Sequence, residues 1–110
     1  MNEKTLDAEL LTRLIQLCFK LSQKPGITET QSRNLIVLGK KLRGVLINVL
    51  TSKFDASTQL FIDSTDELRN TNKALKEALD DLQKTADAIK KATGVLKLLD
   101  KLLQIAVGFL

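Results

Sequence analysis

One apolar residue recurs every seven positions in the second half of the chain, and this spacing restricts the fold more than any other feature. The heptad repeat consists of Phe54, Phe61, Leu68, Leu75, Leu82, Ile89, Leu96 and Leu103. An interval of seven keeps side chains on one face of an α-helix, whereas a half-buried β-strand alternates with an interval of two. The repeat therefore predicts helical structure with a long apolar face.

The repeat lacks the second apolar row that a two-stranded coiled coil requires. If the repeat occupies the d positions, the a positions are Thr65, Asn72, Leu79, Ala86, Thr93 and Asp100. If it occupies the a positions, the d positions are Thr71, Ala78, Thr85, Ala92 and Leu99. One large residue per heptad beside small ones is typical of close packing inside a helical bundle. We therefore expect a bundle and not a parallel zipper.

Composition also favours helices. The 110 residues include no His, Trp or Tyr, one Pro and four Phe, whereas strand-rich domains depend on aromatic and β-branched residues. The length allows a single domain of moderate core size. We predict that residues 1–110 form one all-α domain, an antiparallel helical bundle of three to four helices with one long helix.

The first two helices are predicted on either side of a Pro-Gly turn. The first runs from about Leu6 to Gln23, with Thr5 as N-cap, and ends before Pro25. The second opens with a capping box formed by Thr28 and Gln31. A strand hairpin is the alternative for LIVL and VLINVL, but the 3-4 apolar spacing continues across GKKLRG and favours a helix.

Two glycines inside the second predicted helix need a structural reason. Gly39 and Gly44 each cost about 1 kcal/mol relative to alanine in a helix interior. We expect another helix backbone to pass close to both.

The third helix is predicted to be the longest element. The phase of the repeat favours a start near residues 55–57, a capping box at Ser64 is the alternative, and the helix would continue to about Ala92. Roughly 36 residues would span about 54 Å, against about 27 Å for the first helix. A fourth segment or a second chain would have to cover the difference, and we expect a break at Thr93-Gly94 because glycine is common after helix ends.

The predicted interaction surface lies in the amphipathic segment after that break. It consists of Leu96, Leu99, Leu102, Leu103, Ile105 and Phe109. Residues 95–110 have a broad apolar face opposite lysine, aspartate and glutamine, which is typical of a helix that contacts a partner or an interface. We therefore predict an interaction module that forms homo-oligomers or docks a partner helix.

Residue types needed for most catalytic and metal sites are missing. Without His, a triad with a His base is excluded, and one Cys cannot build a cysteine zinc site. No GxGxxG or GxxxxGK[ST] motif occurs, and Glu77, Asp80 and Asp81 alternate with lysines as on a solvated face. The sequence predicts no enzyme and no cofactor. Cys18, in an apolar stretch, is predicted to be an inert core thiol, and Asn72 a solvated residue, with a buried register-fixing role as its alternative.

The charge is distributed unevenly along the chain. Residues 1–54 contain nine Lys and Arg and four Asp and Glu, and residues 55–110 contain eight and nine. Lys40, Lys41 and Arg43 are therefore candidates for an anion-facing cluster, although a solvated helix face has the same pattern. No recognition motif or aromatic stacking residue supports nucleic-acid binding.

The sequence predicts a cytoplasmic protein. The first ten residues lack the features of a secretory signal, and no stretch approaches the roughly 20 apolar residues of a spanning helix. A peripheral position at a membrane is compatible with the amphipathic C-terminal segment.

A pattern in the second predicted helix resembles a known family. The pattern Asn34-x3-Leu38-x3-Leu42-Arg43-x-Val45-Leu46 lies between an amphipathic first helix and a Leu/Ala-rich helix. Residues 6–92 thereby resemble the HeLo and mixed-lineage-kinase-like N-terminal four-helix bundles. The resemblance implies a bundle that oligomerises and permeabilises membranes in cell death, and GVLKLLDKLLQIAVGFL would add an interfacial helix. This is the alternative function.

Overall fold

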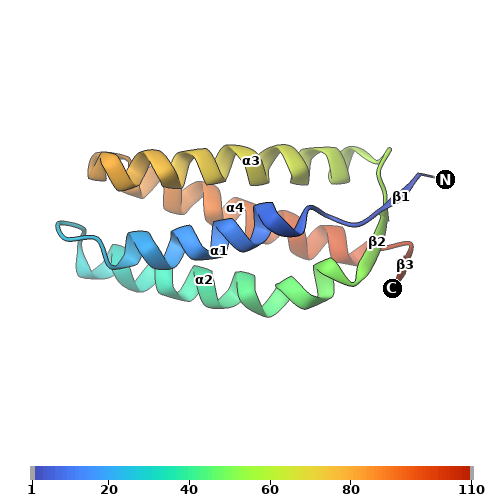
Figure 1. Cartoon of the computed structure of the whole chain (residues 1–110), viewed down its shortest axis with the longest axis horizontal. Helices are drawn as coiled ribbons and strands as arrows, with labels where there is room; N and C mark the ends of the chain where they lie inside the picture. Colours follow the sequence, from blue (N-terminus) through green and yellow to red (C-terminus); the bar gives the residue numbers. More distant parts are fainter. Residues whose placement is uncertain (1, 110) are drawn as a thin grey trace.

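Four α-helices dominate the computed structural model, which describes residues 2–109 (Figure 1). The helices are α1 (Ala8–Ser22), α2 (Glu29–Leu50), α3 (Gln59–Asp80) and α4 (Thr85–Gln104). A 3₁₀ turn, η1 (Leu82–Lys84), joins α3 to α4, and the short strands are β1 (Glu3–Lys4), β2 (Ser52–Asp55) and β3 (Gly108–Phe109). The predicted all-α helical bundle is confirmed, with a small sheet added.

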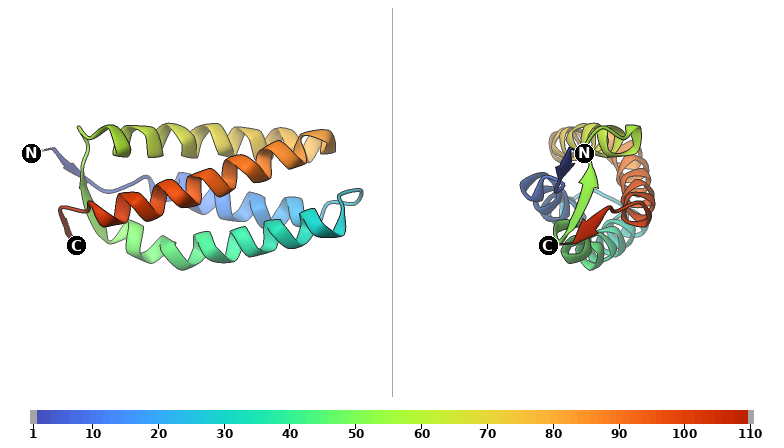
Figure 2. Two further views of the ribbon diagram at one scale, coloured as in Figure 1. Left: turned by 180° about the vertical axis from the view of Figure 1, so that it is seen from behind. Right: turned by 90° about the vertical axis from the view of Figure 1, so that its right-hand side faces the viewer.

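Consecutive helices run antiparallel, but their order around the bundle is not the order of the chain. α1 packs beside α2 and α3, and α4 packs beside α3 and α2. α2 and α3 are therefore diagonal to each other, and β2 crosses the end of the bundle to connect them (Figure 2). As a result, α2 and α4 lie side by side and run in the same direction.

The cap of α1 differs from the prediction. Asp7, and not Thr5, is the N-cap, because its carboxylate accepts hydrogen bonds from the amides of Glu9 (3.0 Å) and Leu10 (3.2 Å). The chain before it is extended, with Glu3–Lys4 in β1.

The turn between α1 and α2 depends on one glycine. Gly26 has φ +99°, a conformation that favours glycine, and a Cβ there would lie 2.9 Å from Cδ1 of Leu82. The α1–α2 turn and the α3–α4 turn therefore contact each other at one end of the bundle.

α2 begins as predicted. The Gln31 amide donates to the Thr28 hydroxyl (3.1 Å), and the Gln31 side chain accepts from the Thr28 amide (3.2 Å). The helix continues without interruption to Leu50, so the hairpin alternative is wrong.

The two α2 glycines have different surroundings. A Cβ on Gly39 would lie 2.8 Å from the Phe19 ring of α1, whereas a Cβ on Gly44 would have nothing within 4 Å. The close neighbour of Gly39 is thus a side chain and not a backbone, and the expectation for Gly44 is wrong.

The predicted long helix is two helices of similar length. α3 ends at Asp80, Asp81 adopts an extended conformation, and its carboxylate accepts from the Gln83 amide (3.1 Å) to cap the 3₁₀ turn. α4 then passes through Gly94 without a break. The physical reason is that an aspartate side chain competes for backbone amides, while an exposed helical glycine costs only about 1 kcal/mol.

The start of α3 agrees with the earlier of the two predicted sites. The N-cap is Thr58, whose hydroxyl accepts from the Phe61 amide (3.4 Å). Ser64 lies inside the helix, where its hydroxyl donates to the Leu60 carbonyl (2.7 Å).

The small sheet joins both ends of the described chain. β2 is central and pairs antiparallel with β1, where Lys4 faces Phe54, and with β3, where Ser52 faces Phe109. Phe54 is fully buried and its ring centroid lies 6.0 Å from that of Phe61. The sheet therefore closes the end of the bundle opposite the two turns (Figure 1).

Two residues on which the sequence allowed alternatives are buried. Asn72 is 6% exposed, contrary to a solvated position, and its amide donates to the carbonyls of Leu10 in α1 (3.0 Å) and Leu68 (2.9 Å). Cys18 is fully buried, and this desolvation raises the pKa of its thiol to about 12. The prediction of a core thiol is confirmed, whereas Asn72 connects α3 to α1.

Candidate functional site

The two halves of the heptad repeat have different surroundings. In α3, Leu68 and Leu75 are fully buried in the core. In α4, Ile89, Leu96 and Leu103 are only partly buried at its edge. The α4 residues that fill the core are Ala88, Ala92, Val95, Leu99 and Leu102. α4 therefore has a second apolar row that its neighbours in the chain cover only in part.

This second row borders a hollow between α2 and α4. The hollow has a volume of about 240 Å³ and is lined by Asn34, Val37, Leu38 and Lys41 of α2 and by Ile89, Thr93 and Leu96 of α4. We call it the α2–α4 groove. Val37 is 43% exposed, so apolar surface is open to solvent along it.

A further hollow of about 250 Å³ lies on the same pair of helices near the strands. Asn48, Thr51, Ser52, Leu103 and Phe109 line it. Because α2 and α4 run in the same direction, residues 34–41 face 89–96 and residues 48–52 face 103–109. The three α4 heptad residues thus follow one side of the bundle from the groove to the sheet.

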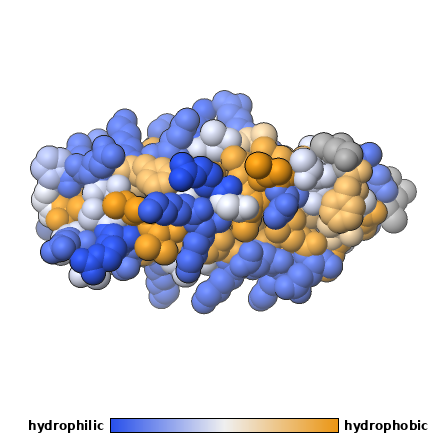
Figure 3. All heavy atoms as spheres, turned by 90° about the horizontal axis from the view of Figure 1, so that it is seen from below, coloured by the Kyte–Doolittle hydropathy of each residue, from blue (hydrophilic) through white to orange (hydrophobic). Residues whose placement is uncertain are grey.

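The end of the bundle near the sheet exposes further apolar side chains. Ile47 is 71% exposed and Phe109 is 76% exposed, and Ile105 and Val107 are each 42% exposed. Figure 3 shows a larger area of hydrophobic atoms on the half of one face nearest the strands, smaller hydrophobic patches toward the other end, and hydrophilic side chains around them. Exposed apolar side chains that gather in this way mark contact surfaces more often than scattered ones do.

The structure separates the predicted interaction residues into three groups. Leu99 and Leu102 are fully buried, so they belong to the core and not to a surface of the folded chain. Leu96 and Leu103 line the groove and the hollow near the sheet. Ile105 and Phe109 are exposed beyond the end of α4.

The reason for burying Leu99 and Leu102 is the continuity of α4. The predicted break at Gly94 would have released the last segment from the bundle, whereas an unbroken α4 packs on α3 and α2. The prediction that this segment has the fewest neighbours in the chain is wrong for those two residues.

The predicted anion-facing residues do not converge on one point. Lys40, Lys41 and Arg43 are all exposed on α2. Lys41 lines the α2–α4 groove, whereas the Arg43 guanidinium lies 5.5 Å from the Phe19 ring centroid on the α1 side. Lys41 and Arg43 thus lie on different sides of α2, and the three residues do not form a pocket for a single anion.

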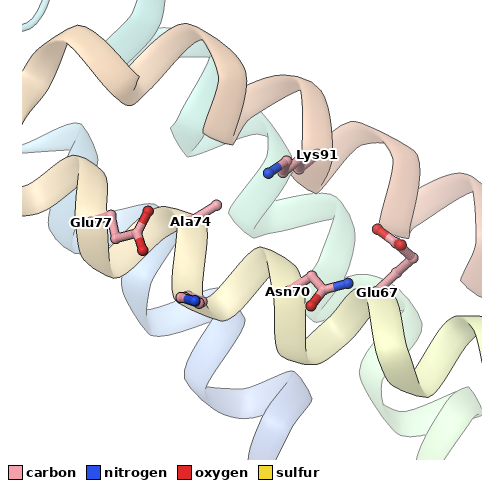
Figure 4. A pocket seen from close by; sticks show the side chains of 6 residues that line it. Glu67, Asn70, Ala74, Glu77 and Lys91 are labelled. Atoms are coloured by element: carbon pink, nitrogen blue, oxygen red, sulfur yellow. The ribbon is translucent and has the colours of Figure 1, made fainter.

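A third hollow, between α3 and α4, is polar. Glu67, Asn70, Ala74 and Glu77 approach it from α3, and Lys91 approaches it from α4 (Figure 4). Lys91 pairs with Asp87 (3.4 Å) and Glu77 with Lys84 (3.7 Å), both at exposed positions. Exposed pairs of this kind contribute little energy, and the arrangement presents no activated nucleophile or base.

Buried polar atoms do not assemble into a site. The Thr71 hydroxyl, the Thr85 hydroxyl and the Asn72 carbonyl oxygen have no hydrogen-bond partner among residues 2–109. None of the three residues lines a described hollow. In the described range 2–109, no group of three or more Cys, Asp and Glu is placed to hold a metal ion.

Sequence reasoning missed Val37 and Ile89 as site residues. The predicted long helix placed Ile89 in the same buried row as Leu68 and Leu75, and Val37 fell outside the 3-4 row of its helix. The signal that could have revealed them is a second apolar row at Ile89, Leu96 and Leu103 beside the one at Ala88, Val95 and Leu102.

Comparisons with known proteins do not assign the chain to a family. The chain matches no protein family model, and neither a curated protein nor a solved structure matches it. None of the helices described in residues 2–109 combines the length and apolar character needed to cross a membrane.

Proposed function

We propose that the chain is a non-enzymatic interaction module that docks a helix along the α2–α4 groove. The observation that carries the proposal is the second apolar row of α4. Ile89, Leu96 and Leu103 are spaced by seven residues, yet remain partly exposed beside α2. A row with this spacing on the outside of a bundle supports contact with another helix.

The dimensions of the row suit a helix of moderate length. Ile89 and Leu103 are fourteen positions apart in α4, which corresponds to about 21 Å at ~1.5 Å per residue. A partner of about four helical turns would therefore cover the row. α2 supplies the opposite wall through Val37 and Lys41.

Self-association is a related function in which the partner is a second copy of this chain. The experiment described below also tests this predicted homo-oligomer. The exposed residue Phe109 belongs to β3, one of the two edge strands of the sheet, and the exposed residue Ile105 lies three positions before β3. β3 is uncharged, whereas β1 at the other edge consists of Glu3 and Lys4. Charged residues protect an edge strand from pairing with another chain, and β3 lacks that protection.

The alternative function is association with a membrane surface, as the resemblance to HeLo-type bundles implies. The outer surface of α2 favours it: Ile36 and Ile47 are exposed there, and Lys40 and Arg43 lie between them in the sequence. Apolar and basic residues interleaved on one helix are typical of interfacial binding. In this alternative the protein is cytoplasmic and peripheral to the bilayer.

The test of the proposed function uses amide chemical shifts of the isotope-labelled full chain. Three helical peptides of about 18 residues share leucines at 3-4 spacing and differ only in their flanks, which are glutamate, lysine or glutamine. Docking predicts shift changes confined to α2 and α4 for at least one peptide. Changes centred on α3, or none with all three peptides, contradict the proposal.

A pair of matched variants controls this experiment, and light scattering of the same samples reports self-association. Val37→Glu introduces a charge in the groove, and Ile62→Glu does so on α3 at a residue of similar exposure, 43% against 40%. Val37→Glu should abolish the shift changes and Ile62→Glu should leave them. Equal effects of the two variants contradict the groove as the site.

A further inference from the structure

We infer that the partner of the α2–α4 groove is an amphipathic helix with acidic flanks. This inference rests on the proposed function and names the chemistry of the partner. It derives from three observations: the distribution of charge over the four helices, the absence of ion pairs at the described lysines beside the groove, and the shape of the groove.

The two helices that form the groove are the most basic ones, since α1 contains only two Lys and Arg and one Glu. α2 contains four Lys and Arg and one Asp or Glu, and α4 contains four and two. α3 contains three and five, and it lies diagonal to α2. No acidic residue occurs between Glu29 and Asp55. The side of the molecule that carries the groove is therefore positive.

The lysines next to the groove have no partner within the described range 2–109. Lys41 lines the groove, and Lys90 and Lys97 each follow a heptad residue of α4 by one position at exposed sites. The ion pairs of the described chain instead join Glu9 to Arg13, Glu29 to Arg33, Asp66 to Arg69, Glu77 to Lys84 and Asp87 to Lys91.

An excess of unpaired charges of one sign beside an apolar row selects a partner of the opposite sign. Charges at the rim of an interface increase the association rate and exclude partners of like charge. Carboxylates on both flanks of an incoming apolar stripe would meet Lys41 on the α2 wall, and Lys90 and Lys97 on α4 beside the groove. Asp100 lies between Leu96 and Leu103 in the sequence and is the one carboxylate in this stretch of α4. The three lysines therefore leave an excess of positive charge.

The shape of the site favours a helix over a lipid surface. The apolar row lies in a hollow between two helices, and a cylinder of helical side chains fits such a depression, as amphipathic helices do in other grooves. The most exposed apolar residues of α2, by contrast, are Ile47 and Val37, of which only Val37 lines the groove. A flat bilayer would engage the outer surface at Ile47 and not the hollow.

A second, folded copy of this chain does not offer an amphipathic helix with acidic flanks. Its acidic helix is α3, whose heptad residues Leu68 and Leu75 are fully buried. α3 therefore has no free apolar stripe to place in the groove. The partner is a helix of another protein.

The experiment measures affinities of the full chain for the glutamate-, lysine- and glutamine-flanked peptides by fluorescence anisotropy. We expect the glutamate-flanked peptide to bind at least about tenfold more tightly than the lysine-flanked one at low salt. This preference should shrink at high salt, because exposed charges are screened. Equal affinities, or a preference for the lysine flanks, would overturn the inference.

Two charge-reversal variants localise the effect. Lys41→Glu should lower the affinity for the glutamate-flanked peptide by about tenfold. Lys76→Glu on α3 should lower it by less than about twofold. Both lysines are exposed and neither forms an ion pair in the described chain, so the fold is retained in both variants. Equal losses in the two would mean that net charge and not the groove attracts the peptide, and would overturn the inference.

The remaining outcomes separate this inference from the proposed function. If only the glutamine- or lysine-flanked peptide binds and shifts α2 and α4, helix docking stands and the acidic partner is wrong. If no peptide binds, both fail. Anionic phosphatidylserine vesicles provide the last arm: binding to them that Ile47→Glu abolishes and Val37→Glu leaves, without binding of any peptide, replaces both with the membrane alternative.

Discussion

The α3 and α4 halves of one heptad repeat perform different tasks in this molecule. Leu68 and Leu75 in α3 are fully buried, whereas Ile89, Leu96 and Leu103 in α4 are partly exposed beside α2. The spacing is identical, and Leu82 between them packs over Gly26 at the turn. A repeat therefore defines a face of a helix but does not define what covers that face.

The difference comes from the packing order around the bundle. α3 lies between α1 and α4, and its heptad row points at the centre. α4 uses the row through Ala88, Val95 and Leu102 for the core, which rotates its heptad row to the outer edge. The small residues Ala88 and Ala92 allow close approach of α3 and α4, as in other bundles.

The largest predicted effect is on stability, and it should differ between a truncated heptad leucine in α3 and one in α4. Leu75→Ala leaves a cavity in the core and should lower the free energy of unfolding by about 2–5 kcal/mol. Leu96→Ala removes a partly solvated side chain and should cost only about 1 kcal/mol. Urea unfolding followed by circular dichroism measures both, and equal losses would show that the α4 half is as deeply packed as the α3 half.

The same contrast between closed and open surroundings occurs within α2. Gly39→Ala places a Cβ 2.8 Å from the Phe19 ring and should destabilise the fold by about 1–3 kcal/mol. Gly44→Ala meets nothing within 4 Å and should stabilise it by about 0.5–1 kcal/mol. Thermal unfolding of the two variants provides the comparison, and shifts of the same sign would refute it.

A smaller effect tests the continuity of α4, on which the position of its heptad row depends. Gly94 lies in the interior of α4, and apart from its chain neighbours and its own helix backbone no described atom lies within 4 Å of its Cβ position. Gly94→Ala should therefore stabilise the protein by about 0.5–1 kcal/mol. A break at Gly94 with a left-handed conformation would instead make the alanine variant less stable, which thermal unfolding detects.

The smallest effect concerns stability at the groove itself. Val37→Glu and Ile62→Glu both replace exposed residues and should change the free energy of unfolding by no more than about 0.5 kcal/mol. Their effects on peptide binding should nonetheless differ, because only Val37 lines the groove. A large loss of stability in Val37→Glu would mean that Val37 serves the core and not a docking surface.

Local signals predicted the fold well where they were unambiguous. The Thr28–Gln31 capping box and the 3-4 spacing of α2 specify that helix completely. The strands could not be predicted, because two-residue segments such as Glu3–Lys4 and Gly108–Phe109 pair with β2 over large sequence distances. Nothing in their own sequence requires that pairing.

The break between α3 and α4 shows how one signal concealed another. Asp81 is a good N-cap residue, but the heptad repeat passes through Leu82 without a change of phase. The sequence instead favours a helix end at Gly94, because glycine is common there. The groove could not be predicted from such a break, because it requires a fourth helix that begins after Asp81 and runs parallel to α2.

Thiol labelling tests the central claim most directly, namely that the α4 heptad row lies outside the core. Cys18 is fully buried and its thiol pKa is raised to about 12, so the unmodified chain is an unreactive control. Under native conditions, Leu96→Cys should react with a thiol reagent at least about a hundredfold faster than Leu75→Cys, which reacts only on unfolding. Equal protection of the two cysteines would contradict the account.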